Sequence, residues 1–121
     1  MSQTILTVDD SRTMRDMLRL ALTEAGFRVV QAIDGLDGLV ALEREGADVI
    51  ITDINMPNLD GFGFIERVRE SGTHRATPIL VLTTESDSDK KERARRAGAT
   101  GWIVKPFNPD KLVAAVRRVA A

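Results

Sequence analysis

The sequence lacks several of the residue types that carry enzyme chemistry. Its 121 residues include no cysteine, no tyrosine and a single histidine. The lack of cysteine excludes disulfides, thiolate metal sites and cysteine nucleophiles, and it suits a reducing compartment such as the cytosol. Any chemistry must therefore depend mainly on carboxylates, hydroxyls, lysine and arginine.

A strong net charge and long apolar runs are also missing. The 17 basic and 18 acidic residues leave a formal net charge of −1, which gives no overall attraction to nucleic acid or to an anionic membrane. No run approaches the ~20 apolar residues of a membrane span, and the start, MSQTILTVDDS, has no signal-peptide pattern. We therefore expect one cytoplasmic, monomeric domain over residues 1–121, with no output module and with neither nucleic acid nor membrane as partner.

Five short apolar runs alternate with five helical patterns along the chain. The runs are rich in Val, Ile and Leu, as strands buried on both faces should be, and they span residues 4–8, 27–31, 48–52, 78–83 and 101–104. Helices are predicted between Ser11 and Gly26, over about 36–45, after Gly61, over about 89–97, and from Pro109 onward. Strict alternation predicts an α/β fold, in which a doubly wound five-stranded parallel sheet carries helices on both faces.

Two of these helices have clear caps and apolar stripes. Ser11 can cap the first helix and Gly26 can end it; its apolar stripe contains Met14, Met17, Leu18, Ala21, Leu22 and Ala25. Asn108 can cap the last helix, with Pro109 at its first position; its inward residues are predicted to be Leu112, Val116 and Val119.

Polar residues follow four of the five predicted strands. In an open parallel sheet, ligands bind beyond the carboxyl ends of the strands, so these residues should lie near one another. They are Asp9, Asp10, Asp53, Thr83, Thr84, Glu85 and Lys105. Taken singly, each has an ordinary explanation: Asp10 could cap a helix, Asp53 could open a turn, and Lys105 could be a solvated loop lysine. Their occurrence at the ends of successive strands favours a shared site.

Three carboxylates crowded at one edge would repel one another, and a bound divalent cation would relieve that repulsion. Oxygen ligands without histidine or cysteine favour a hard ion, above all Mg²⁺. The turn-rich segment after Asp53 offers the backbone carbonyl of Asn55 as a further oxygen ligand. The sequence therefore predicts a magnesium site formed by Asp9, Asp10, Asp53 and Asn55.

Four segments, TVDDSRTMR, IITDINMPNLDG, VLTTE and GWIVKPF, carry a resemblance that covers the whole chain. With them the chain resembles the receiver domain of two-component response regulators, and within that family the single-domain chemotaxis regulators of the CheY type. The resemblance implies a flavodoxin-like sheet of order 2-1-3-4-5. It also implies that Asp53 accepts a phosphoryl group from a histidine kinase of the chemotaxis type.

The same resemblance assigns roles to the other site residues. Asp10, Asp53 and the Asn55 carbonyl would bind Mg²⁺ directly, with Asp9 acting largely through water. Thr83 and Lys105 would hold the phosphoryl oxygens, with the Lys105–Pro106 bond in the cis form. Such a protein is not an enzyme in the usual sense, since it catalyses only its own phosphotransfer and autodephosphorylation and acts on no other substrate.

The resemblance also implies a switch and a partner surface. Phosphorylation would pull Thr83 toward the phosphate, and an aromatic residue would move into the space left behind. That residue is Trp102 here, where the family usually has Tyr or Phe, so a simple packed tryptophan is the alternative. The basic fourth helix is either a solvated face or part of the partner surface formed with the fifth strand and fifth helix. We expect a flagellar motor switch protein as partner; the alternative is a phosphate sink or relay in another two-component pathway.

Two other functions fit the sequence less well. An aspartate-nucleophile phosphatase would need a second acid two residues after its nucleophile, whereas Asp53 is followed by Ile54 and Asn55. A flavin or nucleotide carrier of the same topology would need a Gly/Ser/Thr phosphate loop after the first strand, where this chain has Asp9, Asp10 and Ser11. Acetyl phosphate and flavin mononucleotide would distinguish these functions directly.

Overall fold

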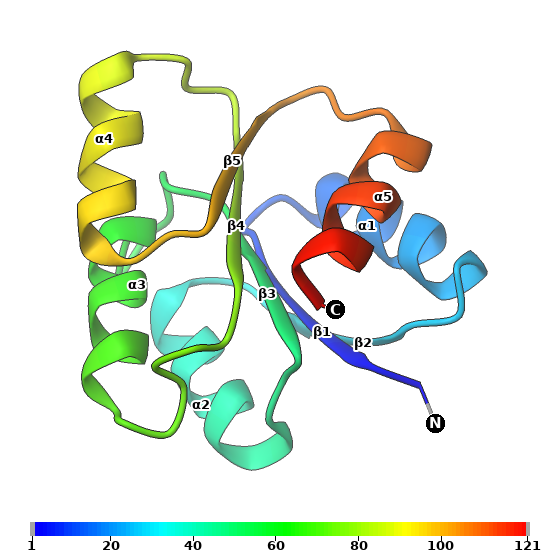
Figure 1. Ribbon diagram of the computed structural model, residues 1–121, viewed down its shortest axis with the longest axis horizontal. Coiled ribbons are helices and arrows are strands. Elements are labelled where there is room, and N and C mark those ends of the chain that lie inside the picture. The colour runs from blue at the N-terminus through cyan, green and yellow to red at the C-terminus, as the bar shows by residue number, and fades with distance from the viewer. Residues whose placement is uncertain (1, 121) are drawn as a thin grey trace.

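The computed structural model describes residues 2–120, in which strands and helices alternate as predicted (Figure 1). The elements are β1 (Thr4–Val8), α1 (Arg12–Glu24), β2 (Arg28–Ala32), α2 (Gly35–Glu45), β3 (Val49–Thr52), α3 (Gly61–Glu70), β4 (Ile79–Thr83), α4 (Ser88–Ala97), β5 (Gly101–Val104) and α5 (Pro109–Ala120). Most predicted bounds differ from these by one residue or none. None of these helices, within residues 2–120, is long and apolar enough to cross a bilayer.

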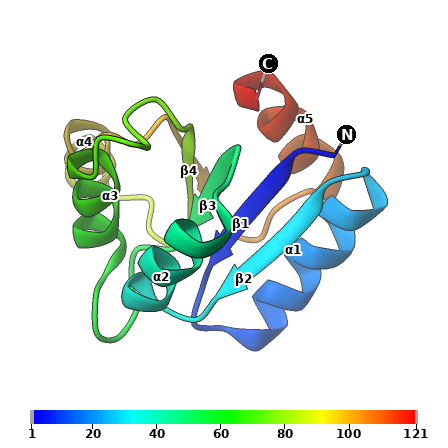
Figure 2. The ribbon, with the colours of Figure 1, turned by 90° about the horizontal axis from the view of Figure 1, so that it is seen from below.

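The five strands form one parallel sheet in the order β2-β1-β3-β4-β5, which confirms the expected topology. Helices α1 and α5 cover one face, and α2, α3 and α4 cover the other, as Figures 1 and 2 show from two directions. The last residue of β1, Val8, pairs with Ala32 of β2 and Thr52 of β3. The strands around β1 therefore end level with one another, and the residues that follow them meet at one edge.

A separate apolar core fills each side of the sheet, because side chains alternate between the faces along a strand. On the α1 and α5 side, Ile5 and Ile51 pack with Leu18 and Leu22 of α1. On the other side, residues such as Phe64 of α3 pack against the neighbouring strand residues. The three inner strands are buried on both faces, as predicted.

The edge strands differ from that expectation. Most residues of β2 and β5 are only half-buried, and Val104 of β5 is 42% exposed. An edge strand has a neighbour on one side only and is incompletely covered by helices. The prediction that all five strands are buried on both faces is therefore wrong for β2 and β5.

The predicted cap of α1 is confirmed and its apolar stripe is narrower than predicted. The Ser11 hydroxyl accepts a hydrogen bond from the Met14 backbone N–H at 3.2 Å, so Ser11, and not Asp10, caps the helix. Gly26 follows the helix with φ of 94°, the left-handed conformation that glycine adopts without strain. Met17, predicted to face inward, is 44% exposed, because the helix buries a narrow strip centred on Leu18.

Helix α5 begins as predicted, with the Asn108 side chain accepting a hydrogen bond from the Lys111 N–H at 3.0 Å. Leu112 and Val116 are buried as expected. Val119 is only partly buried, and Val113 is buried although it lay outside the predicted set.

Candidate functional site

The predicted site residues lie at the carboxyl edge of the sheet, near the point where the strand order reverses between β1 and β3. Asp9 and Asp53 follow directly after Val8 and Thr52, which are paired across the two strands. The Asp53 N–H donates to the Val8 carbonyl at 3.0 Å, which continues the ladder one residue beyond β3. The backbone thereby places the two carboxylates side by side.

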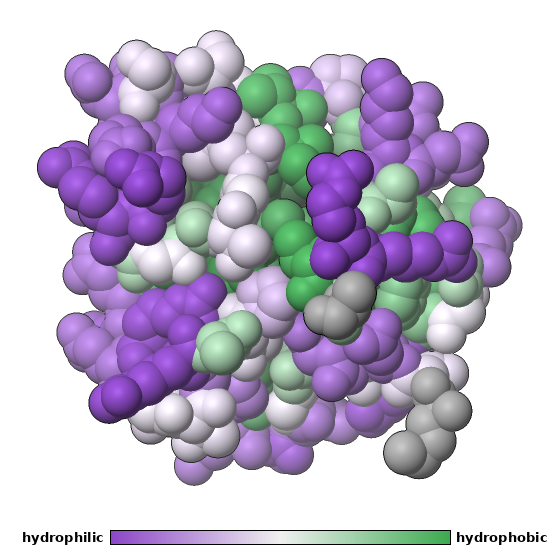
Figure 3. Space-filling view, viewed as in Figure 1, coloured by the Kyte–Doolittle hydropathy of each residue, from purple (hydrophilic) through white to green (hydrophobic). Residues whose placement is uncertain are grey.

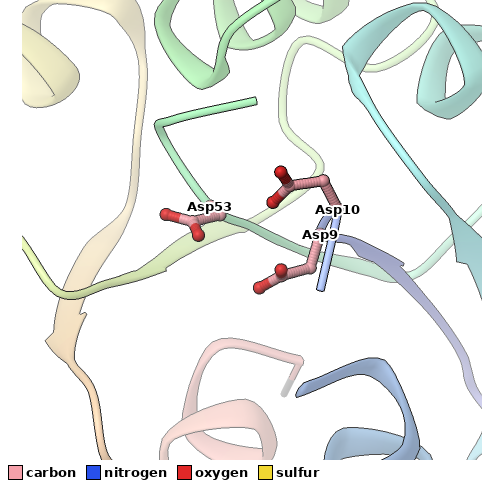
Figure 4. A group of neighbouring side chains, drawn as sticks. All are labelled: Asp9, Asp10 and Asp53. Carbon is pink, nitrogen blue, oxygen red and sulfur yellow. The ribbon is translucent and has the colours of Figure 1, made fainter. Parts of the chain in front are cut away.

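Three carboxylates converge here, as predicted (Figure 4). One oxygen from each of Asp9, Asp10 and Asp53 lies within 4.8 Å of the others. Asp9 and Asp53 are buried, whereas Asp10 is exposed at the mouth of the site. The cluster is therefore open to solvent on one side and fixed to the strand ends on the other.

Lys105 lies against this cluster from the end of β5. Its Nζ is 2.9 Å from Asp9 Oδ2 and 2.9 Å from Asp53 Oδ2, and its side chain is only 11% exposed. The Lys105 N–H also donates to the Thr83 carbonyl at 2.8 Å, which anchors its backbone to β4. The Lys105–Pro106 bond is cis, as predicted.

Burial and charge act against each other in this group. Burial raises the pKa of Asp9, although the Ser11 backbone N–H and the Lys105 ammonium act to lower it. Burial would lower the pKa of Lys105, but the hydrogen bonds and negative charges of Asp53 and Asp9 outweigh it and raise that pKa. Lys105 is thus held in its charged form, whereas the Asp9 carboxylate is incompletely compensated. Additional positive charge at this edge would be stabilising.

The residues present fit a divalent cation. The donors are carboxylate oxygens from two adjacent strands, close enough together to share one ion. A single lysine faces three carboxylates, which leaves a negative charge for a hard cation such as Mg²⁺ to neutralise. The carbonyl of Asn55, on the exposed loop after β3, stays a predicted ligand.

Thr83 is fully buried at the end of β4. Its Oγ1 accepts a hydrogen bond from the Glu85 backbone N–H at 3.3 Å. That contact uses a lone pair of the oxygen and leaves the hydroxyl hydrogen available for an acceptor that enters the site.

The segment after Asp53 is turn-rich because it must fold back against the site. The Ile54 N–H donates to Asp53 Oδ1 at 2.6 Å, which fixes the carboxylate through its own loop. The Gly61 N–H then donates to the Ile54 carbonyl at 2.8 Å and closes the loop. A Cβ on Gly61 would overlap the carbonyl oxygen of Asp53, so glycine is the residue that fits this close approach without displacing the loop.

Sequence reasoning missed a second anchor for this loop. Asn58, in the left-handed region with φ of 69°, donates from Nδ2 to Asp34 Oδ2 at 2.7 Å. Asp34 caps α2 by accepting from the Asp37 N–H at 2.8 Å, and these bonds lower the pKa of Asp34. The Asp–Gly step before the second predicted helix was a signal for the cap, but nothing in the sequence indicated its pairing with Asn58.

Sequence reasoning also left Glu85 without a role. The structure places its carboxylate 3.1 Å from Asn55 Nδ2 and 3.1 Å from Lys90 Nζ, and its carbonyl accepts from Trp102 Nε1 at 3.1 Å. Trp102 itself is half-buried and packs against the core on the α2, α3 and α4 side. This packing confirms neither a switch nor a passive role for Trp102, so its role as a switch stays a prediction.

Comparison with known proteins agrees with this geometry. Residues 5–117 match the family model of the response regulator receiver domain. The chain is 35% identical over 116 residues to a probable chemotaxis protein CheY of Rhizobium etli, covering 95% of this chain and 90% of that one. It is 36% identical over 115 residues, or 95% of its length, to a probable transcriptional regulator, ycf27, of Porphyridium aerugineum, but spans only 47% of that protein.

Solved structures give the same result. Chemotaxis protein CheY4 of Vibrio cholerae superposes with a TM-score of 0.94 at 44% identity, over 98% of this chain and 99% of that one. The receiver domain of sensor histidine kinase PA1611 of Pseudomonas aeruginosa, with a magnesium ion in its active site cleft, superposes with a TM-score of 0.91 at 28% identity, over 99% of this chain and 98% of that one. The chain therefore belongs to the response regulator receiver domain family, and its fold is CheY-like.

Proposed function

We propose that this receiver domain is a switch in which Asp53 accepts a phosphoryl group from a phosphohistidine of a histidine kinase. The observation that supports this most is the position of the Asp53 carboxylate, between two further acids and the Lys105 ammonium at 2.9 Å. A carboxylate in such surroundings can attack phosphorus, because nearby positive charge compensates the negative charge of the phosphoryl oxygens. Phosphoryl transfer depends more on positioning and charge neutralisation than on covalent assistance.

In the proposed reaction, an Asp53 oxygen forms a bond to phosphorus as the bond between phosphorus and the kinase imidazole nitrogen breaks. The imidazole leaves with the electron pair and takes up a proton, and Asp53 becomes an acyl phosphate. Mg²⁺ held by Asp9, Asp10, Asp53 and the Asn55 carbonyl would supply positive charge to the phosphoryl oxygens. Lys105, released from Asp53, would pair with a phosphoryl oxygen, and the Thr83 hydroxyl would donate to another.

Two features support a signalling role over a catalytic one. Thr83 lies buried at the end of β4 with its hydroxyl hydrogen available, and Glu85, two residues later, contacts Trp102. A phosphate adds roughly −1.5 to −2 charges, which can attract the Thr83 hydroxyl and so change the segment that contacts Trp102. We therefore propose Thr83 and Trp102 as the switch residues. The protein acts on no substrate other than its own phosphate.

We further propose that the output surface is formed by α4, β5 and α5. Figure 3 shows strongly hydrophilic side chains on the α4 side and a strip of hydrophobic surface between the α4 and α5 sides. Helix α4 carries five basic residues, which are Lys90, Lys91, Arg93, Arg95 and Arg96. Lys91 and Arg95 line a hollow beside β5, whereas Arg93 and Arg96 lie on the α3 side of the helix. A basic surface beside an apolar strip suits a partner segment that combines acidic and apolar residues. The partner we propose is a flagellar motor switch protein, in line with the chemotaxis proteins named among the relatives.

The phosphoacceptor proposal is tested with acetyl phosphate, read by intact mass. We expect the wild type to gain one phosphoryl group in the presence of Mg²⁺ and little without it, and Asp53→Asn to gain none. Equal labelling of Asp53→Asn would contradict the assignment. Saturable binding of flavin mononucleotide, without labelling, would favour a carrier.

The chemotaxis proposal needs a separate assay. Phosphotransfer from each histidine kinase of the host identifies the donor, and a peptide from the motor switch protein tests the output. We expect the phosphorylated protein to bind the peptide more tightly than the unphosphorylated one. Labelling by a kinase without peptide binding in either state would instead support a phosphate sink or relay. The cytoplasmic location and the monomeric, single-domain state stay predictions.

A further inference from the structure

Arg15, near the start of α1, contacts the loop that carries two of the three acids. Its Nη1 donates to the backbone carbonyl of Asp9 at 2.7 Å, and the residue is half-buried. Long side chains on a helix point back toward the helix N-terminus, which lets Arg15 reach a residue six positions earlier in the chain. The guanidinium therefore supports the acid cluster from outside, through the backbone of one of its members.

The Asp9 carbonyl lies where the ladder between β1 and β2 stops. The Asp9 N–H donates to the carbonyl of Ala32 at 3.1 Å, and Ala32 is the last residue of β2. The N–H and the carbonyl of one strand residue face the same neighbouring strand, but after Ala32 the chain turns into the cap of α2. Asp9 is buried, and a buried carbonyl without a donor costs free energy. The Arg15 guanidinium supplies that donor in place of a strand.

The bond from Arg15 also bears on Asp10, because the Asp9 carbonyl belongs to the peptide unit that joins Asp9 to Asp10. That unit is planar, so a donor on its oxygen fixes the orientation of the whole plane, including the Cα of Asp10. In the described part of the chain, residues 2–120, no ion pair or side-chain hydrogen bond holds the Asp10 carboxylate, whereas Lys105 holds both other acids. The direction of this exposed side chain therefore depends on its backbone, which follows directly after Asp9 (Figure 4).

General helix preferences do not explain an arginine at position 15. A cation near the start of a helix is opposed by the helix dipole, and the first turn of α1 contains no acid that would offset it. The structure instead holds this residue from outside the helix, since Gln31 of β2 donates from Nε2 to the Arg15 carbonyl at 3.1 Å. Strand β2, the start of α1 and the loop after β1 are therefore joined at Arg15.

We propose that Arg15 is a positioning residue for the metal site, which acts through the Asp9–Asp10 peptide to direct the Asp10 carboxylate toward the ion. The inference rests on the metal site of the proposed function. Removal of a group that orients a metal ligand typically weakens metal binding by about 10–100-fold. The charge of Arg15 acts in the opposite direction, because a cation beside the acid cluster repels Mg²⁺. Loss of orientation and loss of charge therefore change the metal affinity with opposite signs.

The test measures Mg²⁺ affinity by calorimetry, at an ionic strength held constant with KCl. Arg15→Met and Arg15→Gln both remove the guanidinium, one with an apolar and the other with a polar side chain. Arg15→Lys keeps the positive charge and a donor of slightly shorter reach. Arg19→Met is the matched control, because Arg19 is an exposed arginine one turn further along the same helix. Thermal melts without metal measure stability separately, and amide relaxation in the metal-free protein reports the order of the Asp10 backbone.

We expect Arg15→Met and Arg15→Gln, at a temperature where circular dichroism shows them folded, to bind Mg²⁺ about tenfold more weakly than the wild type. Their Asp10 amide should also be less ordered. Arg15→Lys should have an intermediate affinity, and Arg19→Met should bind like the wild type.

The outcomes separate this inference from the proposed function. Unchanged or tighter Mg²⁺ binding by a folded variant without the guanidinium, even with a lower Tm, would overturn the positioning role and leave the metal site in place. An equal loss of affinity in Arg19→Met would overturn it as well, since that loss would not depend on the bond to Asp9. An absence of binding heat in the wild type would overturn the metal site itself, and this inference with it.

Discussion

Replacing Gly61 by alanine should displace the proposed phosphoacceptor, although position 61 is not part of the acid cluster. A Cβ added at Gly61 would overlap the carbonyl oxygen of Asp53 and would lie 2.7 Å from the Cα of Ile54. Both are backbone atoms of the loop that carries the Asp53 carboxylate, so the loop must move for the methyl group to fit. Gly63 provides a matched control in the same helix, since its Cβ would meet Leu59 Cδ1 at 2.6 Å, the end of a flexible side chain.

The size of the effect follows from two opposing contributions. Adding a methyl group to a packed site costs about 1–3 kcal/mol, whereas replacing glycine by alanine within a helix gains at most about 1 kcal/mol. Gly61→Ala should therefore lower the free energy of unfolding by about 1–2 kcal/mol. Across domains of different sizes, 1 kcal/mol corresponds to a change of about 2–8 °C in Tm. Gly63→Ala should have a Tm equal to or somewhat above that of the wild type, because the Leu59 side chain can turn away and alanine favours the helix.

The assay combines thermal melts with the initial rate of labelling by acetyl phosphate and Mg²⁺. We expect Gly61→Ala to melt several degrees below Gly63→Ala and to label more slowly at a temperature where both are folded. The reasoning is refuted if the two variants have the same Tm and the same labelling rate. A lower Tm with an unchanged labelling rate would show that the contact supports the fold but does not position Asp53.

Three further predictions concern charged residues around the fold. Lys105→Ala leaves buried Asp9 without its ammonium partner, so it should lose about 3 kcal/mol of stability, and Mg²⁺ should raise its Tm more than that of the wild type. Asp34→Ala removes the cap of α2 and should cost about 1–2 kcal/mol at neutral pH. The pKa of Asp34 is lowered from its usual value of 3.8. In denaturant titrations, the difference in stability between the wild type and Asp34→Ala should therefore be complete above pH 3.8 and should shrink as the pH falls below it. Arg69→Gln should cost about 2 kcal/mol by removing the donors to three loop carbonyls, whereas exposed Arg67→Gln should melt like the wild type.

The local pattern of the sequence predicts most of the fold. Caps such as Ser11 and the glycine after α1 act through neighbouring residues, so they can be identified without a structure. The acid cluster was also predictable, because the carboxyl ends of parallel strands must meet once the alternation of strands and helices is recognised. The order of the strands came from the family resemblance and not from the pattern itself.

The contacts that the sequence could not predict join residues far apart in the chain. The Asn55–Glu85 bond crosses 30 positions and the Asn58–Asp34 bond crosses 24. Periodicity and capping say nothing about such pairs, because they depend on the angle at which each loop leaves its strand. Met17 is exposed because α1 buries only a narrow strip that contains Leu18 and Leu22, and periodicity does not give the width of that strip.

The most direct test of the account is to map the phosphorylated residue in the wild-type protein after labelling with acetyl phosphate and Mg²⁺. The labelled protein is digested under conditions that preserve acyl phosphate, and the peptides are sequenced by mass spectrometry. The account predicts phosphate on Asp53 and on no other aspartate. Phosphate on Asp9 or Asp10, with Asp53 unmodified, would contradict it.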